Sequence, residues 1–298
     1  MTPAPTVLGL PPALPTPLNR WRWLTDPVPA ERAAALRIAT GLVLLLDVLF
    51  LYVPHLRDLY GPDSFGEAAV VAPVFADSWR WSLLQILPAT WGPPALAGLW
   101  ATVAVALVLG YRPRITALVA WVVAVSFVQG NLYQHNGGDQ LKLFLLLMLV
   151  FLPSDGCWAI RRHPAARRGA GPVLVQAWPL RLLMVQLALM YFMNGYYKAM
   201  GPQWVNGTVM TAVAANPTWA RFSPNHLPLP DEMLRALTWA TLAWELFFPL
   251  LVALPLTRRA TLWIGVAFHL GTLIHLELGL FPLIALCYYV PLVPWERR

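Results

Sequence analysis

Eight apolar segments dominate the chain and constrain its fold more than any other feature. A helix that crosses a membrane upright needs about 20 mainly apolar residues, and several of these segments reach or approach that length. Because 58% of the residues are hydrophobic and only 12% are charged, the composition is that of an integral membrane protein. The sequence therefore predicts an all-α integral membrane protein with about eight transmembrane helices. The segments cover approximately residues 33–53, 95–111, 114–131, 140–153, 179–199, 234–254, 260–276 and 280–295.

The distribution of arginine predicts the orientation of these helices. With a cytoplasmic N-terminus, thirteen arginines fall in inner segments and only Arg57, Arg80, Arg221 and Arg235 in outer ones. Basic residues concentrate in cytoplasmic loops, so we expect both termini on that side of a bacterial inner membrane. The two long outer loops, 54–94 and 200–233, are rich in tryptophan, which is typical of re-entrant or interfacial helices.

Several other classes of protein do not fit the sequence. The net charge of +7 comes from short dispersed clusters, so we expect the lipid bilayer and no nucleic acid as a partner. Cys157 and Cys287 are the two cysteines, and HExxH and CxxC motifs are missing, so we predict neither a disulfide framework nor a metal site. Prolines interrupt every apolar stretch of residues 1–30, which we interpret as a loosely ordered, Pro-rich cytoplasmic arm.

Lys198 lies near the outer end of an apolar segment, in the stretch YFMNGYYK. An ammonium facing hydrocarbon is costly, so Lys198 either extends to the membrane edge or lies in a protein cavity. Ala188, Tyr191, Gly195 and Lys198 recur at spacings of three, four and three, so they share one helical face. Such a face, with small residues, a phenol and an amine, can admit a ligand.

Other ionisable residues are predicted to converge on the outer half of the membrane. Asp139 and Lys142 are three residues apart, which equally fits a simple ion pair. We interpret Arg37 as a phosphate-facing anchor, and His275 and Glu277 as interfacial residues. The remaining residues of this group are Asp47, His135 and Asp139, with Glu245 and His269 nearer the midplane. A carboxylate or imidazole deep in a span needs a partner or a function. For Glu245 and His269, a structural hydrogen bond between helices therefore stays open as the alternative.

The stretch YFMNGYYK, followed by QWVNG, resembles vitamin K-dependent gamma-glutamyl carboxylase in its Tyr-Phe, its Gly three residues before a Lys, and its Trp-Val-x-Gly. FHLGTLIHLELGLF resembles a second carboxylase stretch through Phe268, His269, Gly279 and Phe281. The stretches ALRIATGLVLLLD and WPLRLLMVQLALMYF resemble the bacterial relatives of this enzyme, the HTTM-domain proteins. The resemblance identifies residues 31–298 as an HTTM, or carboxylase-like, transmembrane domain.

This resemblance implies a membrane enzyme whose site faces the extracytoplasmic side. Lys198 matches the catalytic base that deprotonates a reduced naphthoquinone, such as vitamin K or menaquinol, with O2 and CO2 as co-substrates. His135 is the nearest equivalent of the family's oxyanion-stabilising histidine, with Asp139 as the alternative. The carboxylase continues into a substrate-holding lumenal domain, whereas this sequence stops at Arg298, so the acceptor stays open. We assign to substrate binding Tyr191, Asn194, Gly195, Trp204, Asp139, Glu245 and His269.

A base at Lys198 must be uncharged. An unperturbed lysine has a pKa of about 10.4, so the pocket would have to disfavour charging by on the order of 4 kcal/mol. We expect this only if no carboxylate lies directly beside the amine. Two other functions stay open. One is a maturation or export factor for a secreted peptide, which some HTTM relatives in toxin operons resemble. The other is a non-enzymatic scaffold that binds quinone or lipid.

Overall fold

The computed structural model describes residues 4–76, 78–131, 136–169, 171–222, 224 and 226–293. The chain forms two compact units. Unit 1 contains Met1–Leu183 and Val290–Arg298, and unit 2 contains Met184–Tyr289. The boundary falls inside the long helix α9 (Trp178–Ala199).

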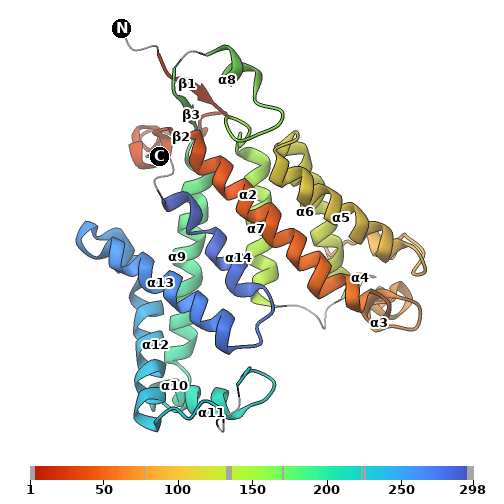
Figure 1. Cartoon of the computed structure of the whole chain (residues 1–298), viewed down its shortest axis with the longest axis vertical. Helices are drawn as coiled ribbons and strands as arrows, with labels where there is room; N and C mark the ends of the chain where they lie inside the picture. Colours follow the sequence, from red (N-terminus) through yellow and green to blue (C-terminus); the bar gives the residue numbers. More distant parts are fainter. Residues whose placement is uncertain are drawn as a thin grey trace. The chain divides into compact units, whose positions relative to one another are not determined.

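Four helices form the core of unit 1. In Figure 1, α2 lies along α5, which packs on α6, which in turn packs on α7. Gly41 allows the close contact between α2 and α5, because a Cβ there would lie 2.9 Å from the carbonyl oxygen of Ala104. The bounds are α2 (Ala30–Asp47), extended by a π-helical turn (Val48–Tyr52), α5 (Gly92–Leu109), α6 (Pro113–Gly130) and α7 (Gly137–Phe151).

A small sheet accompanies these helices, which corrects two expectations. Strand β3 (Val173–Val175) lies between β1 (Thr6–Leu8) and β2 (Val28–Pro29), parallel to the first and antiparallel to the second. Residues 1–30 are therefore not simply a loosely ordered arm, and the fold is not purely helical. The arm also contains a 3-10 turn (Leu18–Arg20) and α1 (Arg22–Thr25). Its backbone pairs with a strand that follows α8 (Pro164–Arg168), a pairing that residue types alone do not reveal.

Unit 2 is built from the second part of α9 with α12 (Asp231–Ala253), α13 (Pro255–His275) and α14 (Phe281–Cys287). Leu254 alone separates α12 from α13, and Pro255 begins the second helix, where a missing N–H is tolerated. Figure 1 shows α13 crossing α12 obliquely.

Short helices occupy both long loops, 54–94 and 200–233, which we expected from the sequence on the outer side. The first loop contains a 3-10 turn (Val53–His55), α3 (Leu56–Tyr60), α4 (Ala68–Ala76) and a second 3-10 turn (Leu83–Gln85). The second contains α10 (Pro202–Val205) and α11 (Val209–Ala215), and α11 packs against α12.

Each of the eight expected apolar segments overlaps a helix, but eight spans are not confirmed. Among the described residues, four helices are long and apolar enough to cross a membrane, and they identify a membrane protein. α7 and α14 are shorter, with 15 and 7 residues. α9 and α13 have 22 and 21 residues but are less apolar over the length of a span than the four candidates. The four candidate spans are Ala30–Tyr60, Gly92–Leu109, Pro113–Gly130 and Asp231–Ala253.

Arg37 is a buried cross-link within unit 1 and not the phosphate-facing anchor that we expected. Its side chain is fully buried. The guanidinium donates hydrogen bonds to the carbonyl oxygens of Ser154 at 3.1 Å, Val108 at 2.7 Å and Trp158 at 2.6 Å, and also to that of Leu107. One side chain thus joins α2 to the last turn of α5 and to the loop after α7.

A second buried cation, Lys142, is compensated by carboxylates. Its Nζ lies 3.0 Å from Asp139 Oδ1, which confirms the ion pair that the spacing suggested, and 2.7 Å from Asp47 Oδ2. The hydroxyl of Tyr52 lies 3.3 Å from the same nitrogen, and the ring of Trp100 lies 5.0 Å away. Among the described residues, these polar neighbours of the ammonium belong to unit 1, and the cluster joins α2 to α7.

We predict that Arg37→Met lowers the free energy of unfolding by about 2–4 kcal/mol, because it leaves buried carbonyl groups without donors. In detergent, thermal unfolding should shift down by roughly 5–15 °C. Arg20→Met, at an exposed arginine of the same unit, serves as the matched control and should leave the midpoint unchanged. Equal midpoints for the two variants would contradict a cross-linking role for Arg37.

Candidate active site

One face of α9 carries the predicted site residues into contact with α12 and α13. Tyr191 is buried, and Gly195 lies against the backbone of α12. A Cβ at Gly195 would lie 2.5 Å from the amide nitrogen of Leu246 and 2.8 Å from its Cα. Gly195 thus holds two helices at close distance. Its position explains why a glycine stands between the phenol and the amine.

Lys198 forms an ion pair with Glu245 on α12. Its Nζ lies 2.6 Å from both carboxylate oxygens. The Glu245 side chain is 4% exposed and that of Lys198 is 25% exposed. Of the two alternatives for this lysine, the structure supports the cavity, because the amine points to a buried partner.

This ion pair does not meet the condition that the sequence set for a neutral lysine. That condition was that no carboxylate lies directly beside the amine, and Glu245 is in direct contact with it. An adjacent opposite charge favours the ionised forms of both groups. Lys198 can therefore act as a neutral base only if another group holds its proton, and Glu245 is the group within hydrogen-bonding distance.

A cavity of about 320 Å³ in unit 2 surrounds the ion pair. The indole of Trp204, from α10, covers Lys198, with its ring centroid 4.6 Å from Nζ. The cavity brings together six of the nine predicted site residues from α9, α10, α12 and α13. They are Tyr191, Asn194, Lys198, Trp204, Glu245 and His269.

A chain of hydrogen bonds joins three buried residues beside this cavity. The Tyr191 hydroxyl bonds to His269 Nε2, and it lies 2.9 Å from the hydroxyl of Tyr289. His269 Nδ1 is buried and has no hydrogen-bond partner among the described residues. If Tyr289 donates to Tyr191, and Tyr191 donates to Nε2, then Nδ1 carries the hydrogen and can donate it to a ligand.

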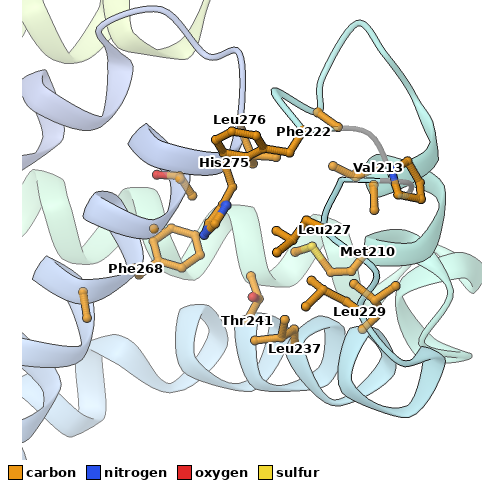
Figure 2. Close-up of a pocket in the computed structure, with 17 residues that line it drawn as sticks. Met210, Val213, Phe222, Leu227, Leu229, Leu237, Thr241, Phe268, His275 and Leu276 are labelled. Carbon is orange, nitrogen blue, oxygen red and sulfur yellow. The ribbon is translucent and has the colours of Figure 1, made fainter.

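A second cavity of about 310 Å³ lies in the same unit and was not foreseen from the sequence. Its walls come from α11, α12, α13 and the loop after α11, as Figure 2 shows for Met210, Leu237 and Phe268. The two cavities share six lining residues, so they adjoin one another. The shared residues are Met210, Val213, Thr241, Phe268, Thr272 and Leu276.

Two predicted site residues, Asp139 and Gly195, do not line either cavity. A third, His135, lies outside the described residues. Asp139 belongs to unit 1, where it pairs with Lys142 and accepts a hydrogen bond from the backbone of Asn136 at the start of α7, so it is not a cavity wall. Gly195 spaces the helices. Within the part of the chain that the structure describes, no group of three or more His, Cys, Asp or Glu side chains could hold a metal ion.

Sequence reasoning missed Tyr289, whose hydroxyl extends the hydrogen-bond chain. Tyr289 lies in the last apolar segment, where a tyrosine is indistinguishable from a core residue. The one available signal was Gly265 on α13, because a Cβ there would collide with the Tyr289 hydroxyl. A glycine within a helix indicates a close approach, but it does not say of what.

Comparison with known proteins places the chain in a family. The model of the HTTM domain matches residues 26–294. The uncharacterized protein YitO of Bacillus subtilis (strain 168) is 31% identical over 126 residues, which cover 40% of each protein. The sporulation-delaying protein SdpB of the same organism is 24% identical over 174 residues, covering 55% of this chain and 53% of that protein.

The chain thus spans about half or less of the length of these two relatives, and no solved structure matches it. The family match is far more extensive, because it takes in all the helices that build the cavities. With a family model that matches nearly its whole length, this chain belongs to the HTTM domain family.

Proposed function

We propose that this protein is a membrane enzyme in which Lys198 and Glu245 together remove a proton from a reduced naphthoquinone. The observation that carries the proposal is the ion pair at 2.6 Å inside a cavity of about 320 Å³. Both groups can exchange protons, and a cavity that holds such a pair beside a ligand-sized space is the usual setting for acid–base catalysis.

The proposed base is the pair and not the lysine alone. Transfer of one proton from Lys198 to Glu245 gives an amine and a carboxylic acid, and the pair stays neutral overall. Apolar surroundings disfavour separated charges, so this neutral form becomes accessible inside the cavity. The free amine then accepts the hydroxyl proton of the substrate, which leaves an anion beside a newly formed ammonium.

The cavity walls suit a flat aromatic substrate. Trp204, Phe268 and Phe281 contribute aromatic rings, and Asn194 adds a polar group to the lining. A reduced naphthoquinone would supply the acidic hydroxyl and, once deprotonated, a ring that reacts with O2. By resemblance to the carboxylase, CO2 is a further co-substrate, and the acceptor of the chemistry is open.

The buried imidazole of His269 is proposed to stabilise the substrate anion. Its Nδ1 has no partner among the described residues, and its Nε2 is held by the Tyr191 hydroxyl. Donors fixed in advance stabilise developing negative charge well, because they need no reorganisation during the reaction. His269 thereby takes the role that the sequence assigned to His135.

We further propose that the cavity faces the extracytoplasmic side of a bacterial inner membrane. The arginine distribution supports eight spans with both termini cytoplasmic and the short outer-loop helices at headgroup level. On this arrangement α9 and α13 also cross the membrane, with Asn194, Lys198 and His269 directed to the cavity.

A second candidate function is the maturation or export of a secreted peptide. The similarity to the sporulation-delaying protein SdpB favours it. Deletion of the gene would then stop secretion of a small peptide encoded nearby, while the chemistry proposed above would be undetectable. A quinone- or lipid-binding scaffold would tolerate the loss of Lys198 and would not tolerate bulk at Gly195.

We predict that purified protein in nanodiscs, given reduced menaquinone, O2 and labelled bicarbonate, oxygenates the quinol. Replacement of both partners, Lys198→Met with Glu245→Gln, should lower the rate by about 10²–10⁴, the usual contribution of a general base. The matched control, Arg221→Gln with Glu277→Gln, removes an exposed ion pair of the same unit and should keep the rate. Fixed label in the product would identify carboxylation. Equal rates in wild type and the Lys198 variant would refute the proposal.

The same variants separate folding from chemistry. Lys198→Met alone leaves the buried Glu245 carboxylate without its partner, so we expect a loss of up to about 3 kcal/mol of stability. Adding Glu245→Gln removes that charge and should restore the unfolding midpoint without restoring the rate. Midpoints measured by thermal unfolding in detergent test this, and a single variant as stable as wild type would argue against a tight pair.

Topology can be tested by thiol labelling, with the wild type as background. Burial, together with the nearby carboxylate of Glu31, raises the pKa of the Cys157 thiol to about 12. Thiolate is the reactive form, so at pH 7–8 wild type should label slowly. In sealed, right-side-out vesicles, a membrane-impermeant maleimide should modify Glu232→Cys, and Arg168→Cys only after the vesicles are opened. The reverse pattern would invert the proposed orientation.

A further inference from the structure

We infer that the cavity of about 310 Å³ is a binding site for one linear apolar chain, carried by the same molecule whose polar head reaches Lys198. The inference rests on the proposed function for the position of that head. It adds the chemical class of the ligand: an amphiphile with a single prenyl or acyl chain, and not a compact, chainless aromatic molecule.

The lining of this cavity excludes most polar ligands. Its walls are aliphatic or aromatic apart from Thr241, Thr272 and His275. The hydroxyl of Thr272 is already used, because it donates to the carbonyl oxygen of His269 at 2.9 Å. An apolar cavity offers water too few hydrogen bonds, whereas it gains contacts with hydrocarbon. Alkyl or prenyl groups are therefore the chemistry that this space recognises.

Continuity with the ion-pair cavity indicates that head and chain belong to one ligand. Thr241 and Phe268 contribute to both cavities, as do four further residues. Each cavity alone is at the lower end of the range for ligand sites, about 300–1,000 Å³. A ligand that fills both would place a hydrogen-bonding head beside Lys198 and its chain among Leu237, Leu229 and Met210 (Figure 2).

Backbone pairing fixes one wall of the chain site. The amide of Arg221 donates to the carbonyl oxygen of His275, and that of Glu277 to the carbonyl oxygen of Trp219, both at 2.9 Å. The rings of Phe222 and His275 meet edge to face at this wall, with centroids 5.9 Å apart. Because the loop is tied to the end of α13, the site cannot widen freely there, which favours one slender chain.

Gly271 on α13 offers a direct test. It lines the cavity, and a Cβ built there has no atom within 4 Å. Gly271→Leu therefore fills the site without a backbone collision. Gly98→Leu is the matched control, because Gly98 lies on α5 in unit 1 and its Cβ also meets no atom within 4 Å.

The experiment measures equilibrium binding to the full chain in nanodiscs, with protein-free nanodiscs subtracted. The probes are a chainless naphthoquinone, the same ring with prenyl chains of increasing length, and a labelled fatty acid. We expect wild type and Gly98→Leu to bind the long-chain quinone at least 10-fold more tightly than the chainless one. Gly271→Leu should lose this extra affinity for the long-chain quinone and keep its affinity for the chainless ring.

A measurement on wild type alone guards against a variant that fails to fold. A fatty acid and a prenylquinone, each with a photoreactive group at the chain end, should label residues 210–237 or 267–276. Labelling by the fatty acid only would identify a lipid chain as the natural occupant and remove quinol chemistry, while the chain site would stand. Binding that depends on chain length, without quinol oxidation, would likewise support the chain site and contradict the quinol chemistry. Affinity independent of chain length, or label elsewhere, would overturn the inference.

Discussion

A charge held among apolar side chains must be compensated by groups in direct contact with it, and three cations in this protein satisfy that constraint in different ways. Arg37 donates to four backbone carbonyls, and Lys142 contacts two carboxylates. Both are at most 2% exposed, so they are enclosed and serve the structure. Lys198 has one carboxylate and one indole, and a quarter of its side chain stays accessible. Of these three cations, Lys198 is the one that lines one of the two cavities described above, which distinguishes a site residue from a structural cross-link.

The compensation at Lys198 also decides what chemistry is feasible there. An isolated amine in a membrane cavity would be neutral but could take up a proton only at the cost of a buried charge. Beside Glu245 the amine is freed when its proton passes to the carboxylate, so no lone charge stays in the cavity. Uptake of the substrate proton then leaves the new ammonium next to the substrate anion and the neutral Glu245 acid. The carboxylate beside the amine is therefore the proton acceptor that makes a free base possible. The hydrogen-bonded chain from Tyr289 through Tyr191 to His269 offers a donor for the anion formed in that step.

How far the sequence could lead depended on whether an interaction was local. Spacing along one helix predicted the shared face of Tyr191, Gly195 and Lys198, and the pairing of Asp139 with Lys142. It could not predict that Glu245, 47 residues from Lys198, is its partner, because that contact depends on how two helices pack. Arg37 was misinterpreted because its partners are backbone carbonyls, which every residue possesses. The strands near residues 6–8 and 28–29 were missed because two or three residues carry no periodicity.

The number of clearly apolar spans and the position of the site are related only in part. The helices that fall outside the four clearly apolar ones include α9 and α13, and these two supply Lys198, Asn194 and His269 to the cavity wall. A helix that lines a polar cavity on one side and meets apolar surroundings on the other cannot be uniformly hydrophobic, and its cavity-facing polar side chains lower its mean hydropathy. Other polar side chains of the same helices, such as Arg181 on α9 and Arg258 on α13, line neither cavity and lower it as well. α12 carries Glu245 and is still one of the four candidate spans, so hydropathy alone does not identify the helices of the site, whereas the contact between Lys198 and Glu245 does.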